Sequence, residues 1–163
     1  NVLNRSNNLL LSLVCFIPTI LVFFVAFIPI SNTINIRLLL ISIIVGGING
    51  IIEEIYWWGL VYKLGNYLFL FFVTILFSLN HASFLFLDFI YQGGAINLIG
   101  GPLFMGIIWI IIAKKTNTIK YGIIAHQFVN IFAFYSLFIN NHIGLINSNS
   151  MYIENIKENI FFG

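Results

Sequence analysis

The feature that most constrains this chain is a succession of five apolar runs, each about long enough to cross a bilayer as a helix. A membrane-spanning helix needs about 20 mostly apolar residues, because each residue advances ~1.5 Å through ~30 Å of hydrocarbon. Charged residues make up only 7% of the sequence, against about 25% in soluble domains. The sequence therefore predicts an all-α, polytopic membrane helix bundle with about five transmembrane helices, at 9–30, 36–62, 67–89, 95–113 and 119–139.

These runs suggest three parts along the chain. We expect an N-terminal transmembrane helix within residues 1–35, a four-helix membrane core over 36–139 and a polar tail over 140–163 with an amphipathic segment near 151–161. Residues 9–30 are too long for a signal-peptide core, so we expect a retained span. Pro18 predicts a kink in it, and the sequence Gly100-Gly101-Pro102 predicts an interruption of the fourth run.

The loop charges predict an orientation and a location. With the N-terminus inside and the C-terminus outside, the basic residues divide unequally, which agrees with the positive-inside rule. Five fall inside and two outside: Arg5, Lys63, Lys114, Lys115 and Lys120, against Arg37 and Lys157. We expect a multi-pass integral membrane protein in contact with lipid. The high Asn, Ile and Phe content suggests an AT-rich, prokaryotic genome and hence a plasma membrane. No basic run suits nucleic acid, and the sequence predicts no particular oligomeric state.

Two adjacent glutamates, Glu53 and Glu54, interrupt the second apolar run. An ionisable group at the centre of a membrane helix costs roughly 2.5–3.5 kcal/mol on insertion scales, and such groups usually mark functional sites. The two carboxylates also repel one another, so at least one needs a proton, a cation or a metal beside it. A purely structural role as a link between helices is the alternative, but one amide would serve that purpose at lower cost.

Two other runs carry polar groups of the same kind. The third contains Phe77 and His81, and the fifth contains His126 and Asn130, whose spacing of four places them on one helix face. At ~1.5 Å per residue, these groups and Glu53 all fall in the inner half of the bilayer or near its midplane. Each histidine could alone be a structural hydrogen-bonding group, but three such helices favour one shared site.

Glycines provide a way for two of these helices to meet. Gly46 and Gly50 form a small-xxx-small pair on a helix face that leads to Glu53. Such pairs allow close approach of a second helix. Asn49 precedes Glu53 by one helical turn and could hold its carboxylate in place.

The residue types suggest hydrolytic chemistry with or without a metal. Glu54, His81 and His126 form a plausible set of Zn²⁺ ligands that leaves a fourth position for water. Zinc would make that water a better nucleophile, the other glutamate would act as general base, and Asn130 would donate to the oxyanion. A metal-free mechanism, in which one glutamate and one histidine activate water, remains open.

The order of these motifs resembles the CAAX protease and bacteriocin-processing family of intramembrane proteases, also called the CPBP or Abi family. Its motifs, EExxxR, FxxxH and HxxxN, correspond here to Glu53 to Trp58, Phe77 to His81 and His126 to Asn130. The resemblance covers about residues 46–132. It implies that Glu53 activates water with Glu54 beside it, that His81 and His126 position metal or water, and that Asn130 supports the oxyanion. The chain departs from the family in having Trp58 in place of arginine, and fewer spans than many members.

The resulting prediction is an intramembrane endopeptidase that hydrolyses a peptide bond in a membrane-associated or prenylated protein or peptide. The alternative is a non-catalytic immunity or adaptor protein of the same family that binds a peptide toxin or another partner. A transporter or proton-relay subunit is a third, weaker hypothesis, because the five spans show no internal repeat.

Overall fold

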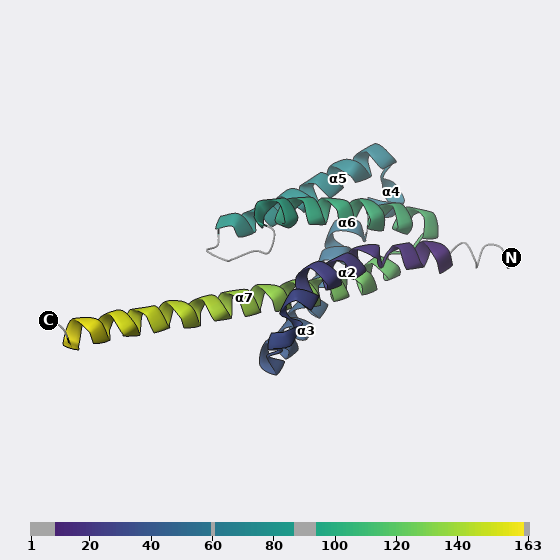
Figure 1. Ribbon diagram of the computed structural model, residues 1–163. Coiled ribbons are helices and arrows are strands. Elements are labelled where there is room, and N and C mark those ends of the chain that lie inside the picture. Colours follow the sequence, from purple (N-terminus) through teal and green to yellow (C-terminus); the bar gives the residue numbers. More distant parts are fainter. Residues whose placement is uncertain (1–8, 60, 87–93, 162–163) are drawn as a thin grey trace.

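The computed structural model describes residues 9–59, 61–86 and 94–161 (Figure 1). Within these residues the chain is helical throughout its length apart from short turns, and no strand occurs. Five stretches are long and apolar enough to span a membrane, namely Leu9–Asn32, Ile36–Leu64, Tyr67–Phe86, Gly94–Thr116 and Lys120–Asn141. The predicted all-α membrane bundle with five spans is therefore confirmed.

The first span is broken where Pro18 was expected to bend it. A helix over 9–14 ends in a turn at Cys15 and Phe16, and α2 (Ile17–Val22) begins with proline in its first turn. Within this turn, the Cys15 carbonyl accepts a hydrogen bond of 3.0 Å from the indole nitrogen of Trp109. The span then continues as a π-helix, η1 (Phe23–Phe27), and a 3₁₀ helix, η2 (Ile28–Thr33).

The second span changes its helical type at the two glutamates. Helix α3 (Ile36–Glu53) begins at Asn35, whose side chain accepts hydrogen bonds from the first turn. A π-helical turn, η3 (Glu54–Trp58), follows directly, and a short helix, α4 (Val61–Leu64), ends the span. Single π-helical turns of this kind are rare and often occur at functional sites.

The third and fourth spans are α5 (Tyr67–Asn80), which continues as the 3₁₀ helix η4 (His81–Phe86), and α6 (Gly94–Thr116). The predicted interruption of the fourth run was wrong, because α6 continues through Pro102. Proline removes one N–H from the helix, and neighbouring helices can satisfy the carbonyls of such a segment. The missing N–H of Pro102 would have paired with the Leu98 carbonyl. At the next carbonyl, that of Ile99, the Ser78 hydroxyl of α5 donates a hydrogen bond of 2.6 Å. The part of the predicted third run beyond Phe86 lies outside the described residues.

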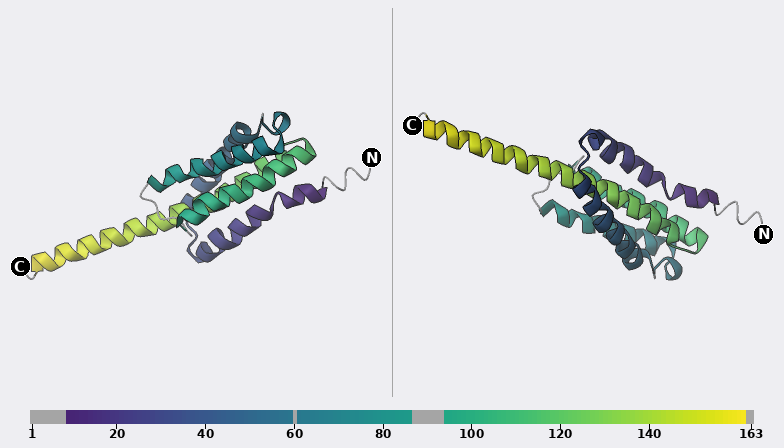
Figure 2. Two further views of the ribbon diagram at one scale, coloured as in Figure 1. Left: turned by 90° about the horizontal axis from the view of Figure 1, so that it is seen from above. Right: turned by 90° about the horizontal axis from the view of Figure 1, so that it is seen from below.

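The fifth span belongs to one long helix, α7 (Lys120–Phe161). The segment near 151–161 is helical as expected, but it continues the span without a break. In every view of Figures 1 and 2, the C-terminal part of α7 extends beyond the other helices.

Glycines bring α3 and α7 into close contact, as the small-xxx-small pair predicted. A Cβ atom at Gly46 would lie 2.7 Å from the Ile131 backbone nitrogen, and one at Gly50 would lie 2.7 Å from that of Gln127. Only glycine therefore permits this separation of the two helices. Gln127 also donates to the Gly47 carbonyl at 3.2 Å, and the contact fixes the height of His126 relative to Glu53.

The remaining helices complete the bundle. Helices α5 and α6 lie side by side on one side of the molecule in Figure 1, with α2 and α7 beneath them. The Thr19 hydroxyl joins α2 to α7 through the Ala125 carbonyl at 3.0 Å. Cys15 is fully buried in the core formed with Trp109, Ala125 and Val129.

Candidate active site

The site is organised around the imidazole ring of His126, which lies between the two glutamates. Its Nδ1 hydrogen-bonds to Oε1 of Glu54 at 3.1 Å. Its Nε2 lies 3.0 Å from Oε2 of Glu53. The Glu53 contact is at ion-pair distance but lacks the geometry of a hydrogen bond, and Oε2 of Glu53 is buried from solvent.

Proton counting constrains the charge of this trio. Ionised carboxylates only accept hydrogen bonds, whereas a neutral imidazole has one N–H and one lone pair. Each of the two contacts therefore requires a proton, carried either by the ring or by a carboxyl group. A ring protonated at both nitrogens would satisfy both contacts and offset one of the two buried negative charges.

His126 is also fixed by aromatic neighbours. It is 1% exposed, the Trp109 indole lies against it with ring centroids 4.5 Å apart, and Phe77 meets it edge-on at 6.0 Å. Sequence reasoning did not identify Trp109, because a tryptophan in an apolar span is by itself typical of core packing. Its pairing with His126 arises only from the packing of α6 against α7.

His81 of the FxxxH motif approaches the site from α5. Its Nδ1 lies 2.9 Å from the Phe77 carbonyl, and because a carbonyl only accepts, this nitrogen carries the proton of that bond. The bond leaves Nε2 with a lone pair. His81 also lies close enough to Glu53 for the two to interact electrostatically, as does Asn49, which is within hydrogen-bonding reach of the same carboxylate.

Asn130 completes the group predicted from sequence. It is 9% exposed, and its amide nitrogen has no hydrogen-bond partner among the described residues. An unpaired buried N–H costs about 1–3 kcal/mol. Such a group is therefore a candidate donor to a bound molecule.

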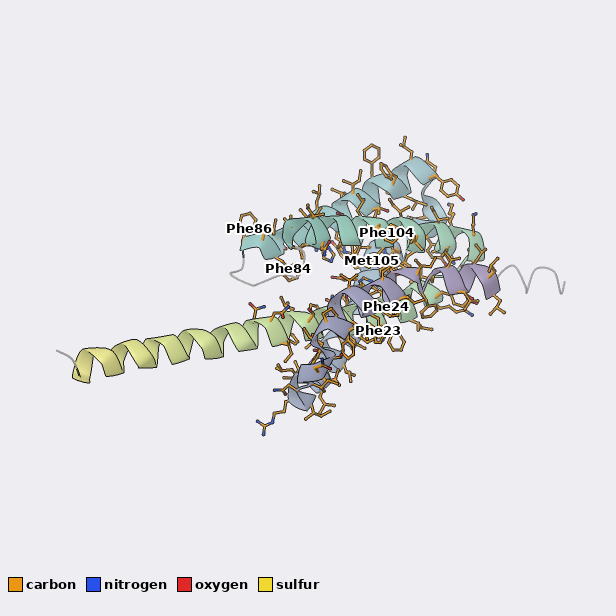
Figure 3. The ribbon with its side chains drawn as sticks, viewed as in Figure 1. Phe23, Phe24, Phe84, Phe86, Phe104 and Met105 are labelled. Atoms are coloured by element: carbon orange, nitrogen blue, oxygen red, sulfur yellow. The ribbon has the colours of Figure 1, made fainter. Side chains whose placement is uncertain are left out.

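One cavity of about 380 Å³ connects these side chains. Glu53, His81, His126 and Asn130 all line it, whereas Glu54 does not. Most of the remaining lining is apolar, and it comes from η1, η4, α2, α6 and α7; it includes Pro18, Leu21, Val25, Phe84, Phe104 and Met105. Figure 3 shows Met105 between α6 and α2, with Phe84 farther to the left, below Phe86. A cavity of this size and character suits an apolar or lipid-modified ligand with one polar reacting group.

The predicted zinc set does not converge in this arrangement. Glu54 lies across the His126 ring from the cavity that His81 lines. Across the described part of the chain, no three His, Cys, Asp or Glu side chains form a group suited to hold a metal ion. The zinc ligand assignments remain predictions. Of the two glutamates, Glu53 lines the cavity, which suits the water-activating role that the family resemblance implies for it.

Trp58 occupies the place of the family arginine and is packed rather than solvated. It is 1% exposed, its ring lies 5.5 Å from that of Phe77, and a Cβ atom at Gly106 would come within 3.2 Å of it. Its indole nitrogen lies near the Glu54 carboxylate but makes no hydrogen bond of standard geometry with any described residue. The bulk of the indole therefore fills a space shaped for it by Gly106.

Comparison with known protein families gives a match to this chain. A family model described as type II CAAX prenyl endopeptidase Rce1-like matches residues 35–132, more than half of the chain. The matched region includes Glu53, His81, His126 and Asn130. No curated protein matches the chain, and no solved structure does.

Proposed function

Because this chain belongs to the type II CAAX prenyl endopeptidase Rce1-like family, we propose that it is an intramembrane endopeptidase that cleaves a membrane-associated or prenylated protein or peptide. The observation that carries the proposal is the shared cavity, in which Glu53 and the unpaired amide of Asn130 meet inside an apolar lining. The family supports protease chemistry, and the cavity supports a substrate with a large apolar part.

Glu53 is the proposed general base. Its carboxylate, which lines the cavity, accepts one hydrogen bond from a water molecule there, and the Nε2 lone pair of His81 accepts the other. As the water oxygen attacks the carbonyl carbon of the scissile peptide bond, its proton passes to Glu53. When the C–N bond breaks, Glu53 returns that proton to the leaving amine, so the carboxylate is regenerated.

Asn130 and His126 are the proposed stabilisers of the tetrahedral intermediate. The unpaired Nδ2–H of Asn130 can donate to the oxyanion without first breaking a bond within the protein. Donors arranged in this way before the reaction act most strongly in a site that excludes water. A protonated His126 beside Glu53 would add positive charge at the same place.

The proposed steps use only groups of the chain, because the three predicted zinc ligands do not converge. We therefore expect the purified protein to contain zinc well below one equivalent and to keep its cleavage rate after treatment with a membrane-permeant chelator. Elemental analysis beside a chelator-treated assay checks both. Stoichiometric zinc, with activity lost on chelation and restored by zinc, would contradict this mechanism while leaving the protease proposal intact.

The direct test is cleavage of a farnesylated peptide ending in a Cys-aliphatic-aliphatic-X sequence by the purified protein in lipid nanodiscs. The same peptide without the farnesyl group serves as the substrate control. Glu53→Gln keeps the size and polarity of the side chain but cannot take a proton, so we expect a loss of at least about 10³-fold in rate. Equal rates in wild type and Glu53→Gln would refute the assignment of the base.

A non-catalytic immunity or adaptor protein is the competing proposal, and Trp58 is the observation that favours it. If the family arginine is essential for catalysis, its replacement by a packed indole would leave a cavity that binds without cleaving. This reading predicts that the farnesylated peptide binds with equal affinity to wild type and to Glu53→Gln and is recovered intact from both. Cleavage by the wild type alone would eliminate it.

A further inference from the structure

We propose that Glu54 is a positioning residue, which acts through His126 and takes no direct part in proton transfer to or from the substrate. The inference deepens the proposed function, because it concerns the same reaction, and it assigns different tasks to two neighbouring glutamates. It begins from the fact that Glu53 and Glu54 contact opposite nitrogens of one ring.

The cavity reaches only one of the two carboxylates. Glu53 lines it and its side chain is 15% exposed, whereas the side chain of Glu54 is 1% exposed and contributes nothing to the lining. The two nitrogens of an imidazole point away from its opposite edges. The His126 ring therefore separates Glu54 from the place where a substrate would react.

The surroundings of Glu54 restrict its movement. On α7, a Cβ atom at Gly122 would lie 2.6 Å from Oε2 of Glu54, so the carboxylate occupies the space that any side chain at Gly122 would fill. Trp58, fully buried one helical turn after Glu54, has its indole nitrogen near the same carboxylate. With its position so restricted, the Glu54 carboxylate offers the Nδ1–H of His126 one fixed acceptor.

Trp109 provides a second, independent restraint on the ring. It packs against His126 at a centroid distance of 4.5 Å and is itself anchored by its hydrogen bond to the Cys15 carbonyl. This tilted ring contact, with an interplanar angle of 34°, limits movement of the imidazole but does not distinguish its two edges. Glu54 distinguishes them, because its carboxylate holds Nδ1. The opposite nitrogen, Nε2, is thereby directed toward Glu53 and the cavity.

Kinetics separate a positioning role from a direct one. In Glu54→Gln, the amide oxygen can still accept from Nδ1–H, whereas Glu54→Ala leaves that N–H without an acceptor. Using the farnesylated peptide in nanodiscs, we expect kcat to fall roughly 10-fold for Glu54→Gln and roughly 100-fold for Glu54→Ala, the range found for carboxylates that orient the histidine ligands of metal sites. We expect KM to change less than about twofold, because Glu54 does not line the cavity.

A second pair of variants tests the space beside Gly122 that holds the Glu54 carboxylate. Gly122→Ala should displace the Glu54 carboxylate and lower kcat as Glu54→Ala does. Gly100→Ala is the matched control, since a Cβ atom there meets nothing within 4 Å. If Glu54→Gln is as inactive as Glu53→Gln, or if Glu54→Ala has the wild-type kcat, the positioning role is refuted.

A spectroscopic measurement makes the inference independent of turnover. The chain has three histidines, so ¹⁵N-labelled imidazoles can be assigned with single His→Gln variants. We expect Glu54→Ala to shift the Nδ1 resonance of His126 and to leave both nitrogens of His81 unchanged, with Glu54→Gln between it and wild type. An unchanged His126 Nδ1 resonance in Glu54→Ala would overturn the inference. Absence of cleavage by the wild type would refute the proposed function alone, since the resonance still decides whether Glu54 holds the ring.

Discussion

At the scale of single residues, the site is made of polar groups that the interior of a membrane protein accepts only when they are paired or used. Glu54 is paired with His126 and enclosed, whereas the Asn130 amide nitrogen is buried without a partner among the described residues. That difference distinguishes residues that fix the geometry of the site from residues whose polar groups are available to bind a ligand. It also indicates where a substitution should affect turnover more than folding.

Asn130→Ala provides such a test. It removes an unpaired donor, so we expect stability to change little while kcat falls about 10²- to 10³-fold, as for loss of one oxyanion donor. The matched control is Asn141→Ala, on the same helix, whose amide donates to the Leu137 carbonyl at 2.7 Å and which does not line the cavity. A rate for Asn130→Ala equal to that of the control would remove Asn130 from the proposed mechanism.

Individual residues also show where sequence reasoning reached its limit. The motifs predicted that Glu53, His81, His126 and Asn130 lie together. Placing an ionisable group inside a membrane helix costs free energy, so three apolar helices that each carry such groups favour one shared functional site. The motifs could not tell which glutamate faces the cavity, since two adjacent helical residues differ in direction by only ~100°. The π-helical turn that starts at Glu54 alters that direction further. Gly122, one helical turn before His126, was the residue that could have indicated space on α7 for the Glu54 carboxylate.

At the scale of elements, the contact between α3 and α7 sets the geometry of the site. Gly46 and Gly50 were recognisable because a small-xxx-small pair has a direct packing meaning. The continuity of α6 could not be recognised in the same way. A Gly-Gly-Pro sequence breaks helices in water, but in a membrane the helix can continue through it when another helix donates hydrogen bonds to carbonyls of that segment. The contribution of Ser78 to α6 depends on tertiary packing, which the local sequence does not encode.

Gly50→Ala tests the α3–α7 contact. The added methyl would lie 2.7 Å from the Gln127 backbone nitrogen, so the helices must separate and the distance between Glu53 and His126 must increase. We expect a loss of about 1–3 kcal/mol in stability, as is usual for overpacking, together with reduced cleavage. Thermal unfolding in detergent measures the first effect.

Gly47→Ala is the control for that experiment. It lies on the same helix, and its Cβ atom would have its nearest neighbour, the Gln127 side-chain nitrogen, at 4.0 Å. We expect its cleavage rate to match the wild type and its melting temperature to equal or exceed that of the wild type, because alanine favours the helix by about 1 kcal/mol over glycine. If Gly50→Ala behaved in the same way, the close contact between α3 and α7 would not be what fixes the site.

At the scale of the whole molecule, hydropathy alone predicted the five spans, since each had to bury its backbone hydrogen bonds within itself. The orientation is a prediction from loop charges that remains to be tested. An odd number of spans places the two termini on opposite sides, and we expect the C-terminus outside. Alkaline phosphatase fused after residue 163 should therefore be active in a bacterial host, and the same enzyme fused in the loop at Asn117 should be inactive. The reverse pattern would invert the orientation and place the site in the outer half of the bilayer.

The central claim is that Glu53 activates water for peptide hydrolysis within the cavity. The most direct measurement is mass spectrometry of the products formed from the farnesylated peptide in H₂¹⁸O by the wild-type protein and by Glu53→Gln. The account predicts one ¹⁸O atom in the new carboxylate after a single cleavage by the wild type, and no product from the variant. Intact peptide after incubation with correctly folded wild type, or labelled product formed equally by both proteins, would contradict it.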